Sequence, residues 1–77
     1  MELRNWVRMH RARLDLTQEE LATALGVSRQ TVHAIERGKA EPSIALALRM
    51  ASLLGVGVGE LFWLEGQTPP ALPRPGT

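Results

Sequence analysis

The 77-residue sequence has no cysteine and no tyrosine, and its aromatic side chains are limited to two tryptophans and one phenylalanine. The absence of cysteine excludes a disulfide framework and a zinc site built on thiolates. A chain this short buries only about 60% of its unfolded surface, so we expect one domain with one small core. That size argues against a multistep enzyme, and the fold must be stabilised by packing alone.

A long uninterrupted apolar run is also missing. The most apolar stretch, IALALRMASLLGVGVGELFWL, is broken by Arg49, Glu60 and three glycines. The N-terminal stretch MELRNWVRMHRARLD carries charges throughout and has no apolar segment of the signal-peptide type. We therefore expect a soluble, cytoplasmic protein with no membrane segment.

Signs of catalysis and of metal binding are scarce as well. Ser28, Ser43 and Ser52 have no base at a motif spacing, and there is no glycine-rich phosphate loop. The two histidines, His10 and His33, have no thiol or ordered ligand cluster to complete a metal site. We therefore expect no enzyme, no metal and no other cofactor. His10 lies on an apolar stripe, which is typical of a part-buried histidine with a backbone partner.

The sequence also lacks a large excess of charge of one sign, since its formal net charge is only +1. The charges are nevertheless unevenly distributed, because residues 1–39 contain seven Lys and Arg against five Asp and Glu, whereas residues 40–77 contain two against three. A polyanion would therefore have to be bound through the placement of charges and not through their total.

Periodicity and capping residues predict a chain of helices. The expected helices cover residues 3–14, 18–25, 29–37 and 44–54, with a short fifth helix in GELFWL. Thr17 and Glu20 form a capping-box pattern, and Ser28 and Ser43 are further N-cap residues. Asp15 ends the first helix in the left-handed position that glycine usually takes.

The stretch SRQTVHAIERGK divides into two faces when it is drawn as a helix. Val32 and Ile35 point to one side, where they can be buried. The residues that point to the other side or to its N-terminal edge are Arg29, Gln30, His33, Ala34 and Arg37. Arg and Gln make bidentate hydrogen bonds to guanine and adenine edges, and a helix fits the major groove of B-DNA. The alternative is an ordinary solvated face, the usual interpretation for an isolated helix.

The stretch TQEELATALGVSRQTVHAIERGKAEPS resembles the helix-turn-helix of the Xre/Cro-like family of bacterial and phage transcriptional regulators, which are related to the lambdoid phage repressors. The resemblance covers residues 3–64 and implies an all-α, compact five-helix lambda-repressor-like domain, with the helix-turn-helix in its second and third helices. We expect this DNA-binding domain to occupy residues 1–66, followed by a flexible proline-rich tail over residues 67–77.

The resemblance also implies roles for individual residues. Those implied to face base edges are Arg29, Gln30, His33 and Ala34. Those implied to contact phosphates are Gln18, Thr31, Arg37, Lys39 and Ser43. An ion pair between Arg11 and Glu36 is implied as well, which would orient the recognition helix more than it would stabilise the fold. His33 could instead pair with Glu36 or remain exposed.

Four residues depart from the family pattern, namely His10, Asp15, Gly57 and Gly59. The two glycines weaken the expected fifth helix.

The fourth helix carries more apolar surface than one buried face needs, because Leu46 and Leu53 project opposite to its other apolar residues. With Trp63 and Leu64, they form the expected dimer interface. The function that follows is a sequence-specific regulator that binds double-stranded DNA in a bacterium or phage, as a homodimeric repressor on a palindromic operator. The alternative is an antitoxin-type or partner-dependent regulator that binds another protein through this apolar surface.

Overall fold

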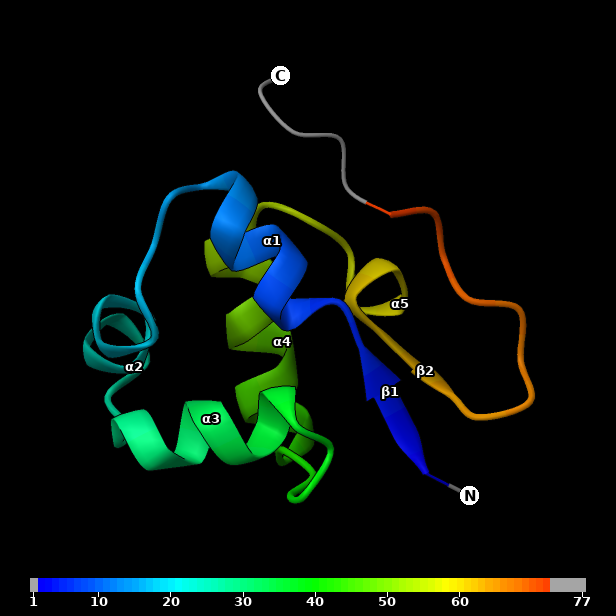
Figure 1. The fold of residues 1–77 in the computed structure, drawn as a ribbon, viewed down its shortest axis with the longest axis horizontal. Helices are drawn as coiled ribbons and strands as arrows, with labels where there is room; N and C mark the ends of the chain where they lie inside the picture. Colours follow the sequence, from blue (N-terminus) through cyan, green and yellow to red (C-terminus); the bar gives the residue numbers. More distant parts are fainter. Residues whose placement is uncertain (1, 73–77) are drawn as a thin grey trace.

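The computed structural model describes residues 2–72 of the chain. Within them the chain forms five helices and one short antiparallel sheet (Figure 1). In chain order the elements are β1 (Leu3–Asn5), α1 (Val7–Arg13), α2 (Gln18–Leu25), α3 (Arg29–Glu36), α4 (Ile44–Leu54), α5 (Val58–Leu61) and β2 (Phe62–Leu64). The predicted five-helix fold class is confirmed, with the sheet as a small addition. None of the helices in this part of the chain is long and apolar enough to cross a membrane.

The predicted first helix over residues 3–14 is wrong at its N-terminal end. Residues 3–5 form β1, which pairs with β2 so that Leu3 lies opposite Leu64 and Asn5 opposite Phe62. The backbone N–H of Trp6 also donates to the carbonyl of Leu61 (2.9 Å). The helical spacing of Leu3 is therefore overridden by pairing with a segment at the far end of the domain, since tertiary context overrides local propensity.

The predicted fifth helix in GELFWL is also wrong at one end, because its last three residues belong to β2. The helix that forms is a single turn, and it begins despite the glycines. The backbone N–H of Gly57 donates to Oε1 of Glu60 (2.7 Å), which supplies a cap that glycine itself cannot provide.

The other helix boundaries follow local capping chemistry, as predicted. Thr17 and Glu20 make a reciprocal capping box at the start of α2. The hydroxyl groups of Ser28 and Ser43 each accept a backbone N–H at 3.1 Å at the starts of α3 and α4. Asp15 has a φ of 59°, the left-handed conformation expected at this helix end. Each N-cap of this kind stabilises a protein by about 1 kcal/mol.

The core lies between α1, α2, α3, α4 and α5. Its buried apolar residues are Val7, Leu21, Ala22, Leu25, Val32, Ile35, Met50, Ala51, Leu54, Leu61 and Phe62. The buried face predicted for α3, with Val32 and Ile35, is therefore confirmed. His10 joins this core with 5% of its surface exposed, and its Nε2 has no hydrogen-bond partner among the described residues. The backbone partner expected for His10 is therefore not found at this nitrogen.

The chain after β2 reverses direction and swings outward from the sheet (Figure 1). The indole N–H of Trp6 donates to the carbonyl of Pro70 (2.8 Å), so residues 65–70 return to the start of α1. Of the flexible tail predicted over residues 67–77, residues 73–77 lie outside the described part of the chain.

Candidate nucleic-acid interface

Helices α2 and α3 pack against each other through a tight corner (Figure 1). Gly26 ends α2 in the left-handed conformation (φ 74°), and Ser28 begins α3. Two short helices joined by such a turn have the geometry of a helix-turn-helix, whose second helix enters the major groove. Val32 and Ile35 are buried beneath α3, which leaves its opposite face for contact with a ligand.

The outward face of α3 holds the residues that the sequence predicts to touch bases. Arg29, Gln30 and His33 are exposed, and Ala34 is half-buried beside them. Arg29 is at the first helical position of α3, the end from which recognition helices contact base edges. The structure therefore brings the four predicted base-contact residues onto one surface.

The residues predicted to touch phosphates lie around this face, and they differ in exposure and in the hydrogen bonds they already make. Arg37 and Lys39 are exposed just after α3. Thr31 is half-buried, and its hydroxyl group lies 2.9 Å from that of Ser28. Ser43 uses its side-chain oxygen to cap α4, so the donors it can offer a phosphate are the free backbone N–H groups at the start of that helix.

An ion pair joins α1 to α3, as the resemblance implies. Nε of Arg11 lies 2.8 Å from Oε2 of Glu36, and Nη2 lies 3.3 Å from Oε1. Arg11 Nη1 also donates to the carbonyl of Leu16 (2.8 Å). The side chain of Glu36 is only 3% exposed, and a buried carboxylate needs such donors to remain charged. The pair therefore ties the C-terminal end of α3 to α1.

Gln18 extends this network to α2. Its Nε2 donates to Oε1 of Glu36 (3.0 Å) and lies 3.2 Å from Nδ1 of His33. The sequence predicts a phosphate contact for Gln18, but the amide hydrogens of its side chain point to these two partners. That contact stays a prediction, and in this geometry it would use the backbone N–H at the start of α2.

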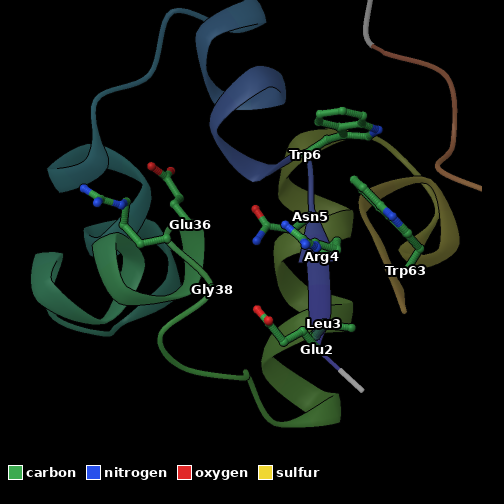
Figure 2. Close-up of a pocket in the computed structure, with 9 residues that line it drawn as sticks. Glu2, Leu3, Arg4, Asn5, Trp6, Glu36, Gly38 and Trp63 are labelled. Carbon is green, nitrogen blue, oxygen red and sulfur yellow. The ribbon is translucent and has the colours of Figure 1, made fainter. Parts of the chain in front are cut away.

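Asn5 is a positioning residue that sequence reasoning missed. Its Nδ2 donates to the carbonyl of Ile35 (2.9 Å), and its Oδ1 accepts the backbone N–H of Val7 (3.0 Å). Asn5 belongs to β1, and its side chain is directed toward the end of α3 (Figure 2). Asn5 and Glu36 both line a surface hollow of about 260 Å³. An Asn two residues before an apolar helix start is a capping signal, but the predicted helix over residues 3–14 concealed it.

Two arginines that the sequence left unassigned hold helix ends. Arg49 Nη2 donates to the carbonyl of Leu25 at the end of α2 (2.7 Å). Arg13 Nη2 donates to the carbonyl of Leu54 at the end of α4 (2.9 Å). Cations are favourable at helix C-termini, so these side chains serve the scaffold and are not free to contact DNA.

The residues predicted for a dimer interface differ in their exposure, and their role stays a prediction. Leu46 packs against the core, and Leu53 is exposed on α4. Trp63 is half-buried and packs against Trp6, with ring centroids 4.8 Å apart (Figure 2). Leu64 is exposed at the end of β2.

A different apolar surface lies on α4. Ile44 is 82% exposed and Leu48 is 52% exposed, and they are one helical turn apart on the same face. They border an apolar hollow of about 310 Å³, whose lining residues are Leu3, Pro42, Ile44, Ala47, Leu48, Val58 and Phe62. We call this surface the α4 hollow.

The comparisons with known proteins agree with this geometry. The helix-turn-helix (HTH_3) family model matches residues 7–61. An uncharacterized HTH-type transcriptional regulator of Methanocaldococcus jannaschii is 48% identical over 63 residues, covering 82% of this chain and 96% of that protein. The cryptic phage CTXphi transcriptional repressor RstR, from Vibrio cholerae, is 36% identical over 55 residues, covering 71% of this chain and 50% of RstR.

Solved structures of regulators are also similar. The restriction-modification controller protein C.AhdI from Aeromonas hydrophila superposes with a TM-score of 0.65 at 32% identity, over 69% of this chain and 80% of that protein. The clp gene regulator ClgR from Corynebacterium glutamicum superposes with a TM-score of 0.66 at 36% identity, over 69% of this chain and 56% of ClgR.

Proposed function

Because the chain belongs to the helix-turn-helix family of DNA-binding transcriptional regulators, we propose that it binds one particular double-stranded DNA sequence and represses the promoter that contains it. The family assignment makes it a DNA-binding regulator and not an enzyme.

The observation that carries this proposal is the division of α3. Its inner residues Val32 and Ile35 are buried, whereas Arg29 and Gln30 are exposed at its N-terminal end. The outward side chains can offer hydrogen bonds to base edges while the buried ones hold the helix in place. The ion pair between Arg11 and Glu36 supports the same interpretation, because it fixes the C-terminal end of α3 against α1.

We assign the contacts as follows. The residues proposed to read bases are Arg29, Gln30, His33 and Ala34. Those proposed to position the duplex through its phosphates are Gln18, Thr31, Arg37, Lys39 and Ser43. Base contacts determine sequence preference, whereas phosphate contacts supply most of the salt-dependent affinity.

We further propose that two copies bind together, with the α4 hollow as the contact between them. Ile44 and Leu48 are large apolar side chains left exposed beside it, and exposed apolar patches mark interaction surfaces. A two-fold pair would place two α3 helices on half-sites about one helical turn apart, which predicts a palindromic operator. Doubling the contacts is also the simplest way for a small domain to gain specificity.

The likeness to RstR supports repression over activation, because that relative is named a transcriptional repressor. A repressor of this kind acts by occupying the promoter, which blocks access to that DNA.

The test is selection of bound sequences from a random pool of duplexes at about 150 mM salt, where non-specific phosphate binding is weak. We expect an enriched motif with two-fold symmetry. Absence of any enriched motif, from protein that is folded by circular dichroism, would contradict sequence-specific binding. Enrichment of an asymmetric single site would contradict the dimer.

A second candidate uses the same α4 hollow for a different protein, as in an antitoxin-type or partner-dependent regulator. The exposure of Ile44 favours it as much as it favours a dimer. Measuring the size of the purified chain distinguishes the homodimer from the partner-dependent regulator. A stable monomer that binds no palindrome would favour a different protein as the partner.

A further inference from the structure

The side chains between α1, α2 and α3 form a directional series of hydrogen bonds. Arg11 donates to Glu36, and Nε2 of Gln18 donates to the same carboxylate at 3.0 Å. A carboxylate only accepts, so Glu36 determines which end of the Gln18 amide faces inward. The nitrogen of that amide is the atom 3.2 Å from Nδ1 of His33.

The orientation of Gln18 bears on the tautomer of the neutral His33 ring. A neutral imidazole has one N–H and one nitrogen that accepts, and the hydrogen bond at one nitrogen selects the tautomer. Because the NH2 group of Gln18 is a donor, Nδ1 of His33 has to accept from it. The proton of the neutral ring is then on Nε2, the nitrogen on the other side of the ring from Gln18.

We propose that Gln18 is a specificity-determining positioning residue that favours the Nε2–H tautomer of His33, so that His33 donates to a hydrogen-bond acceptor on DNA. DNA also offers O6 of guanine and O4 of thymine as acceptors; among all of these we assign His33 to N7 of a purine or an oxygen of a phosphate. The opposite tautomer would present a lone pair that could accept from the amino group of cytosine, and the Gln18 bond disfavours it. This inference rests on the proposed function, in which the outward face of α3 contacts DNA.

The position of His33 supports this role. The ring is exposed on α3 and borders a polar hollow of about 410 Å³ that also contains Arg8 and Arg37. A DNA strand that approaches α3 would meet this ring beside two cationic side chains. A donor on Nε2 complements the same acceptor-rich surface that the two arginines attract.

The first test needs no DNA. In the ¹⁵N-labelled full chain at about pH 8, where an ordinary histidine is neutral, long-range ¹H–¹⁵N spectra report which nitrogen of His33 carries the proton. We expect Nε2–H, and we expect Gln18→Met to reduce the ratio of Nε2–H to Nδ1–H roughly two- to tenfold, as loss of one hydrogen bond of ordinary net strength implies.

Gln67→Met is the matched control, because it makes the same substitution at an exposed glutamine outside α3. It should leave the His33 spectrum unchanged. If Gln18→Met fails to fold, Gln18→Asn shortens the side chain so that it cannot reach both partners. A proton on Nδ1, or identical tautomer ratios in the native chain and in the folded Gln18 variant, would overturn the proposal.

The second test uses the selected operator. Single 7-deazapurine and single methylphosphonate substitutions are compared for the native chain and for His33→Ala. A loss of affinity at one 7-deazapurine that disappears in the variant identifies a purine N7, and the same pattern at one methylphosphonate identifies a phosphate. Losses that are equal in both proteins at every position would overturn the DNA contact of His33, whereas absence of DNA binding altogether would overturn the proposed function and leave the tautomer result intact.

Discussion

At the scale of the residue, His10 links stability to pH. Burial lowers its pKa below the ordinary 6.5, the positive charge of Arg13 lowers it further, and Glu60 opposes the shift. The unfolded chain therefore binds a proton at a pH where the folded chain does not, so the stability from this residue is full above about pH 6.5 and falls on acidification below it. We expect the melting temperature to fall between pH 7 and pH 5.

His10→Leu should flatten that pH dependence, because it removes the buried titrating group. Gln30→Leu is the matched control, since it makes an apolar substitution at an exposed residue that does not titrate and should retain the slope. Thermal unfolding followed by circular dichroism checks both variants. Parallel slopes in the native chain and in His10→Leu would show that other groups cause the acid sensitivity.

The outward face of α3 gives a second prediction about single residues. Arg29→Ala should cost roughly 1–3 kcal/mol of binding free energy and relax the preference at one base position. Lys39→Ala should weaken all sequences alike and reduce the slope of log affinity against log salt by about 1. Titrations on the selected operator and on its single-base variants measure both. Equal losses without any change in base preference would contradict the assigned roles.

At the scale of the element, the end of α3 depends on the strand that precedes α1. Asn5→Ala removes the donor to Ile35 and the acceptor for Val7. We expect a loss of roughly 1–2 kcal/mol in the free energy of unfolding, measured by urea denaturation. Gln67→Ala, which removes an exposed bond to the backbone of Leu64, should cost less, and an equal cost would show that the link to α3 has no special weight.

The elements whose ends are held by local contacts were predictable from the sequence. Capping at Thr17 and Ser28 involves residues within one turn, so local patterns predicted α2 and α3 correctly. The β1–β2 pairing joins residues 3–5 to residues 62–64, and no local pattern reports a partner so distant. Asn5 was missed for this reason, because its partner Ile35 is also far along the chain.

The candidate site divides in the same way. The outward residues of α3 follow from helical periodicity alone, and the structure places them as that periodicity predicts. The inward turn of the Gln18 amide depends on a buried carboxylate from another helix, which periodicity cannot show.

At the scale of the whole molecule, the α4 hollow determines the proposed oligomeric state. Ile44→Glu should abolish dimers, lower affinity for the palindrome and leave the fold intact, because the native side chain is 82% exposed. Sedimentation and operator titration measure these effects. Leu53→Glu places the same charge at another exposed leucine of α4 and should remain dimeric. The reverse result would assign the interface to the Leu53 surface.

The Trp6–Trp63 pair provides an optical signal for the pairing of β1 with β2. The two indole rings are 4.8 Å apart and inclined by 46°, close enough for their electronic transitions to couple and to produce an exciton band in circular dichroism. The rings belong to the ends of the domain that β1 and β2 bring together, and not to α3. That band would therefore report when β1 and β2 pair during refolding, separately from the formation of the helices.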